Sequence, residues 1–239
     1  MEPEKYYAQF GEDKILNELF KKREGTCVEV GGFDGITGSN TYFFERLGWR
    51  CLVVEPMPDF CERIRSIRTC DVAEIAASDK AGEVDFYIAT GAETLSTIQK
   101  DDEHFARIKS LGDEKIRQIR VKTARLDDIL LERGMTNIDF LTIDVEGHEM
   151  SVLAGMSFNK ISPRIVIIED NSFGSDTQVK KLMETVSYVR FKRTGCNDWY
   201  AKNDDRFVST MQVLHTELSI FATFIWRRFK SQVKRMIRR

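Results

Sequence analysis

Several features are scarce in this chain of 239 residues, and each absence excludes a class of protein. Only 4 prolines and 15 glycines are present, too few for a collagenous chain or a disordered chain rich in both. The five cysteines form no CxxC pair and no zinc-ligand spacing, which is typical of a reducing compartment. The first ten residues, MEPEKYYAQF, do not resemble a signal peptide, and the longest apolar run, 220–226, is too short to cross a bilayer. These absences favour a cytoplasmic protein.

Charge is distributed unevenly along the chain. The 36 basic and 38 acidic residues give a net charge of -2. Seven of the basic residues fall in the last 13 positions, which contain no acid, and this leaves 29 basic against 38 acidic residues, or -9, in the remainder. An acidic body argues against a nucleic-acid partner, because affinity for nucleic acids comes largely from neutralising phosphates.

The C-terminal segment 207–239 is expected to form a basic amphipathic helix that follows a domain of residues 1–206. A basic helix with an aromatic-rich apolar stripe, with Trp226 near its boundary, has the composition of a peripheral anchor on an anionic membrane surface. The alternative is that the stripe packs on the body or on a second subunit; the pattern does not give an oligomeric state. The stripe residues recur at helical spacing: Leu218, Phe221, Ala222, Ile225, Phe229, Val233, Met236 and Ile237.

Between these ends, strand-like and helix-like segments alternate. Several of the strands are apolar throughout, which favours an α/β fold with a mostly parallel sheet and helices on both faces. Segment 90–117 is polar, with weak helical spacing at Phe105, Ile108 and Leu111. Strands are expected at 26–32, 50–56, 70–78, 83–89, 119–122, 138–144 and 164–170, helices at 11–22, 39–48, 58–67, 126–134, 148–155 and 177–186, and an antiparallel hairpin at 188–203.

The first two strands end in residues suited to a nucleotide. The first leads into EVGGFDG, where glycines let the backbone approach a ligand, and the second ends in Glu55, 20 residues beyond Gly35, where an acid commonly binds ribose hydroxyls. This is not the GxGxxG pattern, and the carboxylates of Glu29 and Asp34 suit a cationic ligand better than a pyrophosphate. S-adenosylmethionine therefore fits better than NAD. A simple glycine turn and a solvated acid remain the alternatives.

Two later strands also end in polar residues. The strand at 138–143 is followed by DVEGHE, in which Asp144 is the first acid and His148 is a candidate general base; the alternative is the solvated start of a helix. Asp144, Asp170 and Asn171 together offer hard oxygen ligands for Mg²⁺ or Mn²⁺, unless residues 170–171 only cap a turn.

In this order, the blocks YYAQFGEDKIL, VEVGGFDGITGSNTYFFERLGW, VVEPMPDF, IDFLTIDVEGHEMSVLAG and RIVIIEDN resemble the FkbM-like family of S-adenosylmethionine-dependent methyltransferases, over residues 6 to about 203. The resemblance implies a Rossmann-like fold with strand order 3-2-1-4-5-7-6. It also implies O-methylation, often of a sugar hydroxyl in a glycan, glycolipid or natural product. Gly32 departs from the alanine usual in the family. The implied cofactor-binding residues are Gln9, Glu29, Gly31, Asp34, Ser39, Asn40 and Glu55, and Asp144 and Glu146 would face the transferred methyl group.

Two other functions are compatible with parts of the pattern. A scaffold or binding protein can retain this fold without catalysis, although Glu55 and Asp144 are both present. A dehydrogenase is disfavoured by the missing GxGxxG and by the extra acids.

Overall fold

The computed structural model describes residues 5–21, 24–90, 98 and 115–237. The chain divides into two compact units, residues 1–163 and 164–239, and each is described by itself. The helical spacing expected around Phe105, Ile108 and Leu111 falls outside the described residues.

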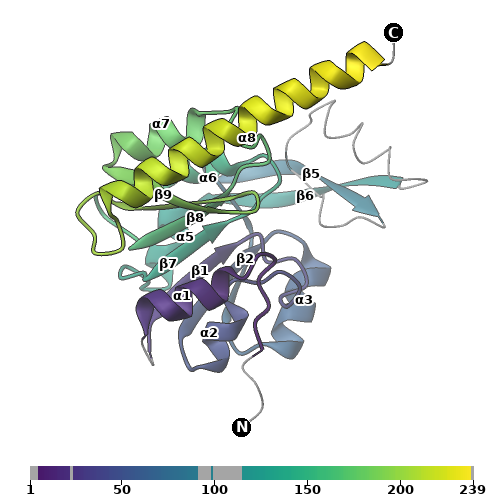
Figure 1. Ribbon diagram of the computed structural model, residues 1–239. Coiled ribbons are helices and arrows are strands. Elements are labelled where there is room, and N and C mark those ends of the chain that lie inside the picture. The colour runs from purple at the N-terminus through teal and green to yellow at the C-terminus, as the bar shows by residue number, and fades with distance from the viewer. Residues whose placement is uncertain (1–4, 22–23, 91–97, 99–114, 238–239) are drawn as a thin grey trace. The chain divides into compact units, whose positions relative to one another are not determined.

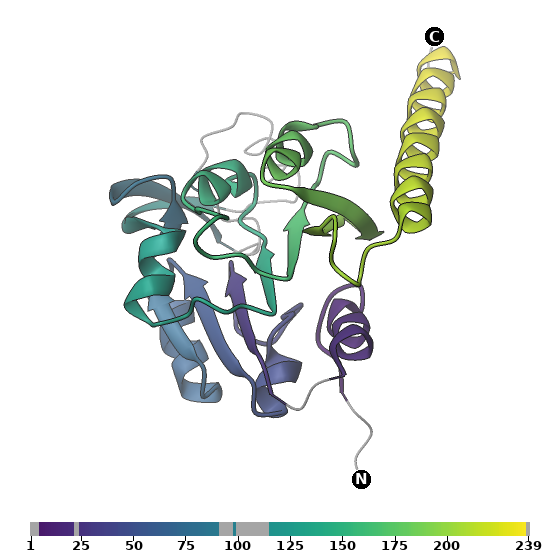
Figure 2. The same cartoon turned by 90° about the vertical axis from the view of Figure 1, so that its left-hand side faces the viewer.

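The first unit is built around four parallel strands, β1 (Thr26–Val30), β2 (Arg50–Glu55), β3 (Asp71–Glu74) and β7 (Phe140–Ile143). β1 is the central strand and pairs with β2 on one side and β7 on the other, while β3 extends the sheet beyond β2. Figure 2 shows the arrows of β1 and β2 pointing the same way. All four residues of β7 are buried, as expected for an apolar run inside a parallel sheet.

Helices α1 (Glu12–Phe20), α2 (Tyr42–Arg46) and α3 (Pro58–Ile67) precede or connect these strands. α3 begins at a proline, whose fixed φ suits the first turn of a helix, and it ends where the sequence predicted. Phe20, Phe44, Trp49 and Phe140 join α1, α2 and β7 through ring contacts of 4.7–6.3 Å. This aromatic core fixes α1 and α2 against the strand that carries Asp144 at its end.

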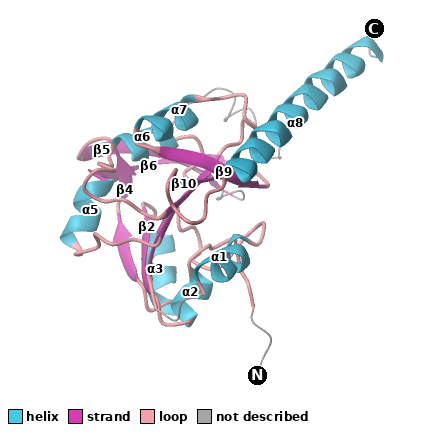
Figure 3. Cartoon of the chain, turned by 60° about the vertical axis from the view of Figure 1, so that its left-hand side comes forward, coloured by secondary structure: helices cyan, strands magenta, loops and turns pink. Residues whose placement is uncertain are grey.

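A second, three-stranded sheet in this unit corrects the expected strand pattern. The segment 70–78 is not one strand: β3 ends at Glu74, and β4 (Ala76–Ser78) pairs instead with β6 (Lys115–Arg125). The strand expected at 83–89 is β5 (Gly82–Thr90), which pairs antiparallel with β6 rather than joining the main sheet. Figure 1 shows β5 and β6 as a long ribbon, and Figure 3 shows α5 (Leu126–Glu132) beside β4. α6 (Glu149–Ala154) also packs against β4.

The second unit contains β8 (Ile165–Glu169), α7 (Gln178–Thr185), β9 (Tyr188–Thr194), β10 (Asn197–Lys202) and the long helix α8 (Thr210–Ile237). β10 pairs antiparallel with both β9 and β8, which confirms the predicted hairpin. Trp199, Tyr188 and Tyr200 are almost completely buried and form the centre of this unit.

The strand order of the main sheet is β3-β2-β1-β7-β8-β10-β9. Counted among the strands of this sheet alone, that order is the 3-2-1-4-5-7-6 implied by the sequence resemblance. The α/β class, the mostly parallel sheet and the antiparallel closing hairpin are thus confirmed. Within the described ranges, no helix combines the length and the hydropathy needed to cross a membrane.

Candidate functional site

The glycine loop after β1 lies directly against the loop after β7. Gly31 has φ +91°, and a Cβ built on it would lie 1.7 Å from the backbone oxygen of Asp144, so any side chain there would separate the two loops. A Cβ on Gly32 would lie 2.1 Å from Cγ1 of Val53. The departure from alanine at position 32 is therefore explained by the β-branched side chain of the neighbouring strand. Gly31 thus keeps the end of β1 against the end of β7, and Gly32 keeps it against β2.

The side chain of Glu55, at the end of β2, holds this glycine loop by accepting hydrogen bonds from the backbone of the loop. Its Oε2 accepts hydrogen bonds from the N–H groups of Gly32 at 3.1 Å and Phe33 at 3.0 Å, and its Oε1 accepts one from Met57 at 2.9 Å. Burial raises the pKa of Glu55 to about 7, although these three bonds act in the opposite direction. A carboxylate has about four lone-pair sites, so Glu55 keeps the capacity to accept a further hydroxyl.

Glu29 points into the loop that precedes α2. Its Oε2 accepts hydrogen bonds from the hydroxyls of Ser39 at 2.7 Å and Thr41 at 2.6 Å, and its Oε1 accepts one from the backbone of Asn40 at 2.7 Å. The side chains of Glu29 and Ser39, both predicted to bind cofactor, thus bind each other and fix the position of Asn40.

Arg68 completes this buried cluster, and the sequence analysis did not identify it. It donates from Nε to Glu45 at 2.6 Å and from Nη2 to Thr41 at 3.0 Å, and Nη1 lies 3.5 Å from Glu29. Burial by itself would lower the pKa of Arg68, but the carboxylates of Glu29 and Glu45 outweigh it and raise the pKa. No short motif contains Arg68; the only signal was an unexplained cation just after α3.

Asp34 organises the next turn of the same loop. Its Oδ1 accepts hydrogen bonds from the backbone of Ile36 at 2.9 Å and Thr37 at 2.7 Å, and Arg63 lies 3.3 Å from its Oδ2. Burial would raise the pKa of Asp34, but these hydrogen bonds and Arg63 lower it overall. Asp34 is therefore ionised at neutral pH, and its hydrogen bonds fix the shape of the loop.

Asn40 and Gln9 are two further predicted residues at this loop. The buried Oδ1 of Asn40 accepts no hydrogen bond from any described residue. Gln9 is exposed, and its neighbour Ala8 forms an isolated bridge with Gly38, so this part of the chain lies beside the glycine loop. An acceptor without a donor fits a site completed by a ligand that donates hydrogen bonds.

The acidic segment after β7 is held in a tight turn. Asp144 is exposed, Glu146 has the left-handed φ of +50°, and Oε1 of Glu149 accepts hydrogen bonds from the backbone of Val145 at 3.3 Å and Gly147 at 3.0 Å. A non-glycine residue in the left-handed region stores strain, which is common at functional sites.

His148 lies at the start of α6, where its Nε2 is 3.2 Å from the hydroxyl of Ser78 in β4. Burial lowers the pKa of His148, although the nearby Asp79 acts in the opposite direction. The imidazole is therefore neutral at pH 7, the form that accepts a proton.

The predicted metal ligands of the second unit receive no support from their surroundings. Oδ1 of Asp170 accepts a hydrogen bond from the backbone of Ser172 at 2.9 Å, and Oδ2 accepts bonds from Gly174 at 2.7 Å and Arg193 at 2.9 Å. Burial would raise the pKa of Asp170, but these partners lower it. Asn171, the other predicted ligand here, is exposed. Both oxygens of Asp170 are thus occupied by the turn that follows β8 and by Arg193 of β9.

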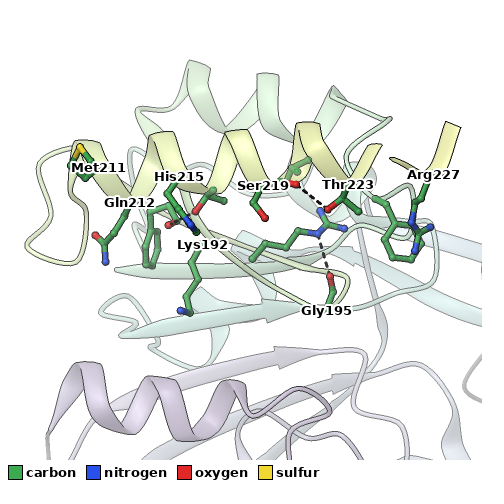
Figure 4. A pocket seen from close by; sticks show the side chains of 13 residues that line it. Lys192, Gly195, Met211, Gln212, His215, Ser219, Thr223 and Arg227 are labelled. Carbon is green, nitrogen blue, oxygen red and sulfur yellow. Dashed lines mark hydrogen bonds between the residues drawn. The ribbon is translucent and has the colours of Figure 1, made fainter. Parts of the chain in front are cut away.

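A pocket of about 730 Å³ lies within residues 164–239, between β9 and α8. Figure 4 shows Ser219 and Thr223 on its α8 wall, opposite Lys192 and Gly195. Its lining combines two phenylalanines with hydroxyl and basic side chains and includes no acid among the described residues, and Arg227 covers the ring of Phe173 at 3.3 Å. Such a mixture suits a ligand with both apolar faces and hydroxyls. No sequence motif marked this pocket, because its residues come from three separate segments.

The known proteins that resemble this chain include methyltransferases. Over 161 residues the chain is 26% identical to the 2-O-methyltransferase NoeI of Sinorhizobium fredii, an alignment that covers 63% of this chain and 65% of NoeI, just under two thirds of that curated relative. A TehB-like SAM-dependent methyltransferase from Corynebacterium glutamicum gives a TM-score of 0.43 at 9% identity, covering 81% of this chain and 88% of that one. A SAM-dependent methyltransferase from Aquifex aeolicus gives 0.42 at 10%, covering 80% and 89%.

The family comparison is decisive. Residues 29–196 match the model of the methyltransferase FkbM domain, and the matched stretch begins at Glu29 and includes Glu55, Asp144 and the turn after β8. A family model that covers this much of the chain implies S-adenosylmethionine as the cofactor. The chain therefore belongs to the FkbM-domain family of methyltransferases.

Proposed function

We propose that this protein transfers the methyl group of S-adenosylmethionine to a hydroxyl group of a sugar, in a glycan, a glycolipid or a natural product. The observation that carries the proposal is the buried carboxylate of Glu55 at the end of β2, which braces the glycine loop beside it. The name of the relative NoeI, a 2-O-methyltransferase, supports transfer to oxygen. The alternative of a scaffold without catalysis predicts no turnover.

The residues at the glycine loop fit this cofactor. Glu55 would accept a hydrogen bond from a ribose hydroxyl, and the unpaired Oδ1 of Asn40 would accept one from the ammonium group. Glu29 and Asp34 add negative charge around the loop, which suits a ligand with two cationic centres, and Gln9 lies beside it. When bound, S-adenosylmethionine supplies an electrophilic methyl carbon.

The chain must align the acceptor and remove its proton, because a sugar hydroxyl is a weak nucleophile at neutral pH. We assign proton removal to Asp144, with Glu146 in the same turn positioning the acceptor. Asp144 is exposed at the end of β7, while its backbone is fixed against Gly31. His148 is a second candidate base, since burial keeps it neutral, but Ser78 occupies its Nε2.

The direct test is transfer of labelled methyl from S-adenosylmethionine to a panel of oligosaccharides, glycolipids and non-sugar alcohols. We expect product on sugar acceptors, with the label in an O-methyl group on mass spectrometry. Calorimetry with S-adenosylmethionine and with NADH separates the alternatives. Binding of neither would favour the scaffold, and binding of NADH alone would favour a dehydrogenase.

Cofactor binding is expected to depend on pH through Glu55. The carboxylate form would accept a ribose hydroxyl, so protonation below its pKa of about 7 should weaken binding, by up to about tenfold per pH unit. Calorimetry from pH 6 to pH 8 measures this. Glu55→Gln should bind about 5- to 150-fold more weakly and lose most of the pH dependence, a range that corresponds to about 1–3 kcal/mol.

Glu62→Gln on the exposed side of α3 is the matched control and should behave like the wild type.

The effect of pH on the stability of the unliganded fold has the opposite sign to its effect on cofactor binding. Since the folded pKa of Glu55 is raised, the group favours the unliganded fold at low pH and loses that contribution as the pH rises through about 7. Equal affinity of wild type and Glu55→Gln across the range would remove Glu55 from the cofactor site.

A further inference from the structure

α8 is attached to its own unit by a polar face. Glu217 forms a bidentate pair with Arg190, at 3.0 Å from both Nε and Nη2, and a second pair with Lys180 at 2.7 Å. Thr216 donates its hydroxyl to the backbone oxygen of Phe191 at 2.9 Å. Ile220 is 8% exposed and packs so closely on Gly174 that a Cβ there would lie 2.4 Å from it. Thr216, Glu217 and Ile220 therefore define the inner face of the helix.

The apolar stripe of α8 lies on another face, turned away from these contacts. The exposed fractions include 58% for Leu218, 62% for Phe221 and 64% for Phe229. These side chains follow each other at intervals of three and four residues, so they form one continuous stripe along the helix. The large exposed members are Met211, Leu214, Leu218, Phe221, Ile225 and Phe229, with Trp226 at the edge. In most amphipathic helices of a globular unit the apolar side faces inward, so this arrangement calls for an external apolar partner.

The charge of the segment that carries the stripe indicates what that partner is. Beyond Glu217, which Arg190 and Lys180 already neutralise, the sequence to residue 239 contains no acid and seven Lys or Arg residues, of which Arg227 lies over the ring of Phe173. Lys230 is exposed and lies 4.5 Å from the ring of Trp226, an aromatic residue of the type enriched at membrane interfaces.

A second copy of the same helix would bring like charges together, whereas an anionic bilayer offers both apolar depth and negative charge. We therefore propose that the exposed stripe of α8 inserts shallowly into an anionic lipid surface, with the basic C-terminal half of the helix on the headgroups. The helix lies along the surface, since it is not apolar enough to cross a membrane. The proposal is independent of which acceptor the enzyme methylates.

Co-sedimentation of the full chain with lipid vesicles tests this. One set contains phosphatidylglycerol in phosphatidylcholine and the other phosphatidylcholine alone, each at low and high salt. We expect binding to the anionic vesicles at low salt and loss of binding at high salt, because the headgroup attraction is screened.

Phe221→Gln with Phe229→Gln should weaken the partition coefficient at least about tenfold, and Lys230→Gln with Lys234→Gln about 30-fold, at about fivefold per basic residue. The matched control for the stripe is Leu47→Gln with Leu131→Gln, two exposed leucines outside α8, and Lys202→Gln controls for charge. Circular dichroism checks that helix content is retained in each variant.

Three outcomes would overturn the proposal. The first is failure of the wild-type chain to bind anionic vesicles at low salt. The second is a dimer in light scattering that dissociates in Phe221→Gln with Phe229→Gln and that ignores vesicles, which would assign the stripe to a second copy. Binding that is equal on neutral vesicles and insensitive to salt would also contradict it, since the basic half of α8 would then play no part.

Discussion

Replacing Asp144 with asparagine is expected to lower kcat by about 10²- to 10⁴-fold and to leave the Kd of S-adenosylmethionine nearly unchanged. The amide keeps the size of the side chain but cannot remove a proton from the acceptor hydroxyl. The fold should survive, because Asp144 is held through its backbone: its N–H donates to Val30 at 2.9 Å, and its carbonyl packs on Gly31. Single-turnover methyl transfer and calorimetry separate the two effects.

Asp128→Asn is the matched control, since Asp128 is an exposed acid on α5 in the same unit. His148→Gln tests the other candidate base. Because burial lowers the pKa of His148, a rate that depended on it would fall only at acidic pH. A large loss of kcat in His148→Gln, with none in Asp144→Asn, would transfer the role to the histidine.

Chelation with EDTA tests the predicted metal at Asp144, Asp170 and Asn171. We expect turnover to be unaffected, because both oxygens of Asp170 already accept hydrogen bonds within their own turn. Loss of activity with EDTA, restored by Mg²⁺ or Mn²⁺, would establish the metal. Asp144 would then be a metal ligand rather than the base.

The strands of the main sheet could be predicted because each is a short, self-contained signal. β1, β2 and β7 are apolar runs that end in glycine or an acid, and Pro58 marks the start of α3. The division of segment 70–78 could not be predicted. It depends on a tertiary contact, in which the backbone of Ile75 turns to donate to Glu55 at 3.2 Å, and on the pairing of β4 with the distant β6.

The candidate site shows the same limit. The positions of Glu55 and Asp144 follow from the rule that parallel strands present functional residues at their carboxyl ends. What Glu29 binds does not follow from any such rule, because its partners come from the loop before α2 and, in Arg68, from the end of α3. The pocket between β9 and α8 was not predicted for a similar reason, because the sequence of α8 predicts a separate tail.

Arg68→Met is expected to lower the free energy of unfolding by about 3–5 kcal/mol, the largest stability effect we predict. The side chain of Arg68 is fully buried between the carboxylates of Glu29 and Glu45. Methionine fills similar space but leaves two buried acids without their cation. Because Glu29 also fixes Ser39, Thr41 and Asn40, the loop at the cofactor site should loosen, and affinity for S-adenosylmethionine should fall with stability.

Urea denaturation measures this, with Arg65→Met as the matched control on the same helix. Arg65 pairs with Glu74 at 2.8 Å, but both side chains are well exposed, so its loss should cost less than about 1 kcal/mol.

The pH dependence of the free energy of unfolding gives a second readout. Although burial would raise it, the pKa of Glu45 in the fold is lowered by Thr69 and Arg68. The ionised Glu45 thus stabilises the wild type at pH values above 4.5, the ordinary pKa of this group. This contribution to stability is lost as the pH falls through the lowered pKa. Arg68→Met should lose much of this acid sensitivity. If Arg68→Met were as stable as Arg65→Met at neutral pH, the cluster would not be what holds the glycine loop and α2 together.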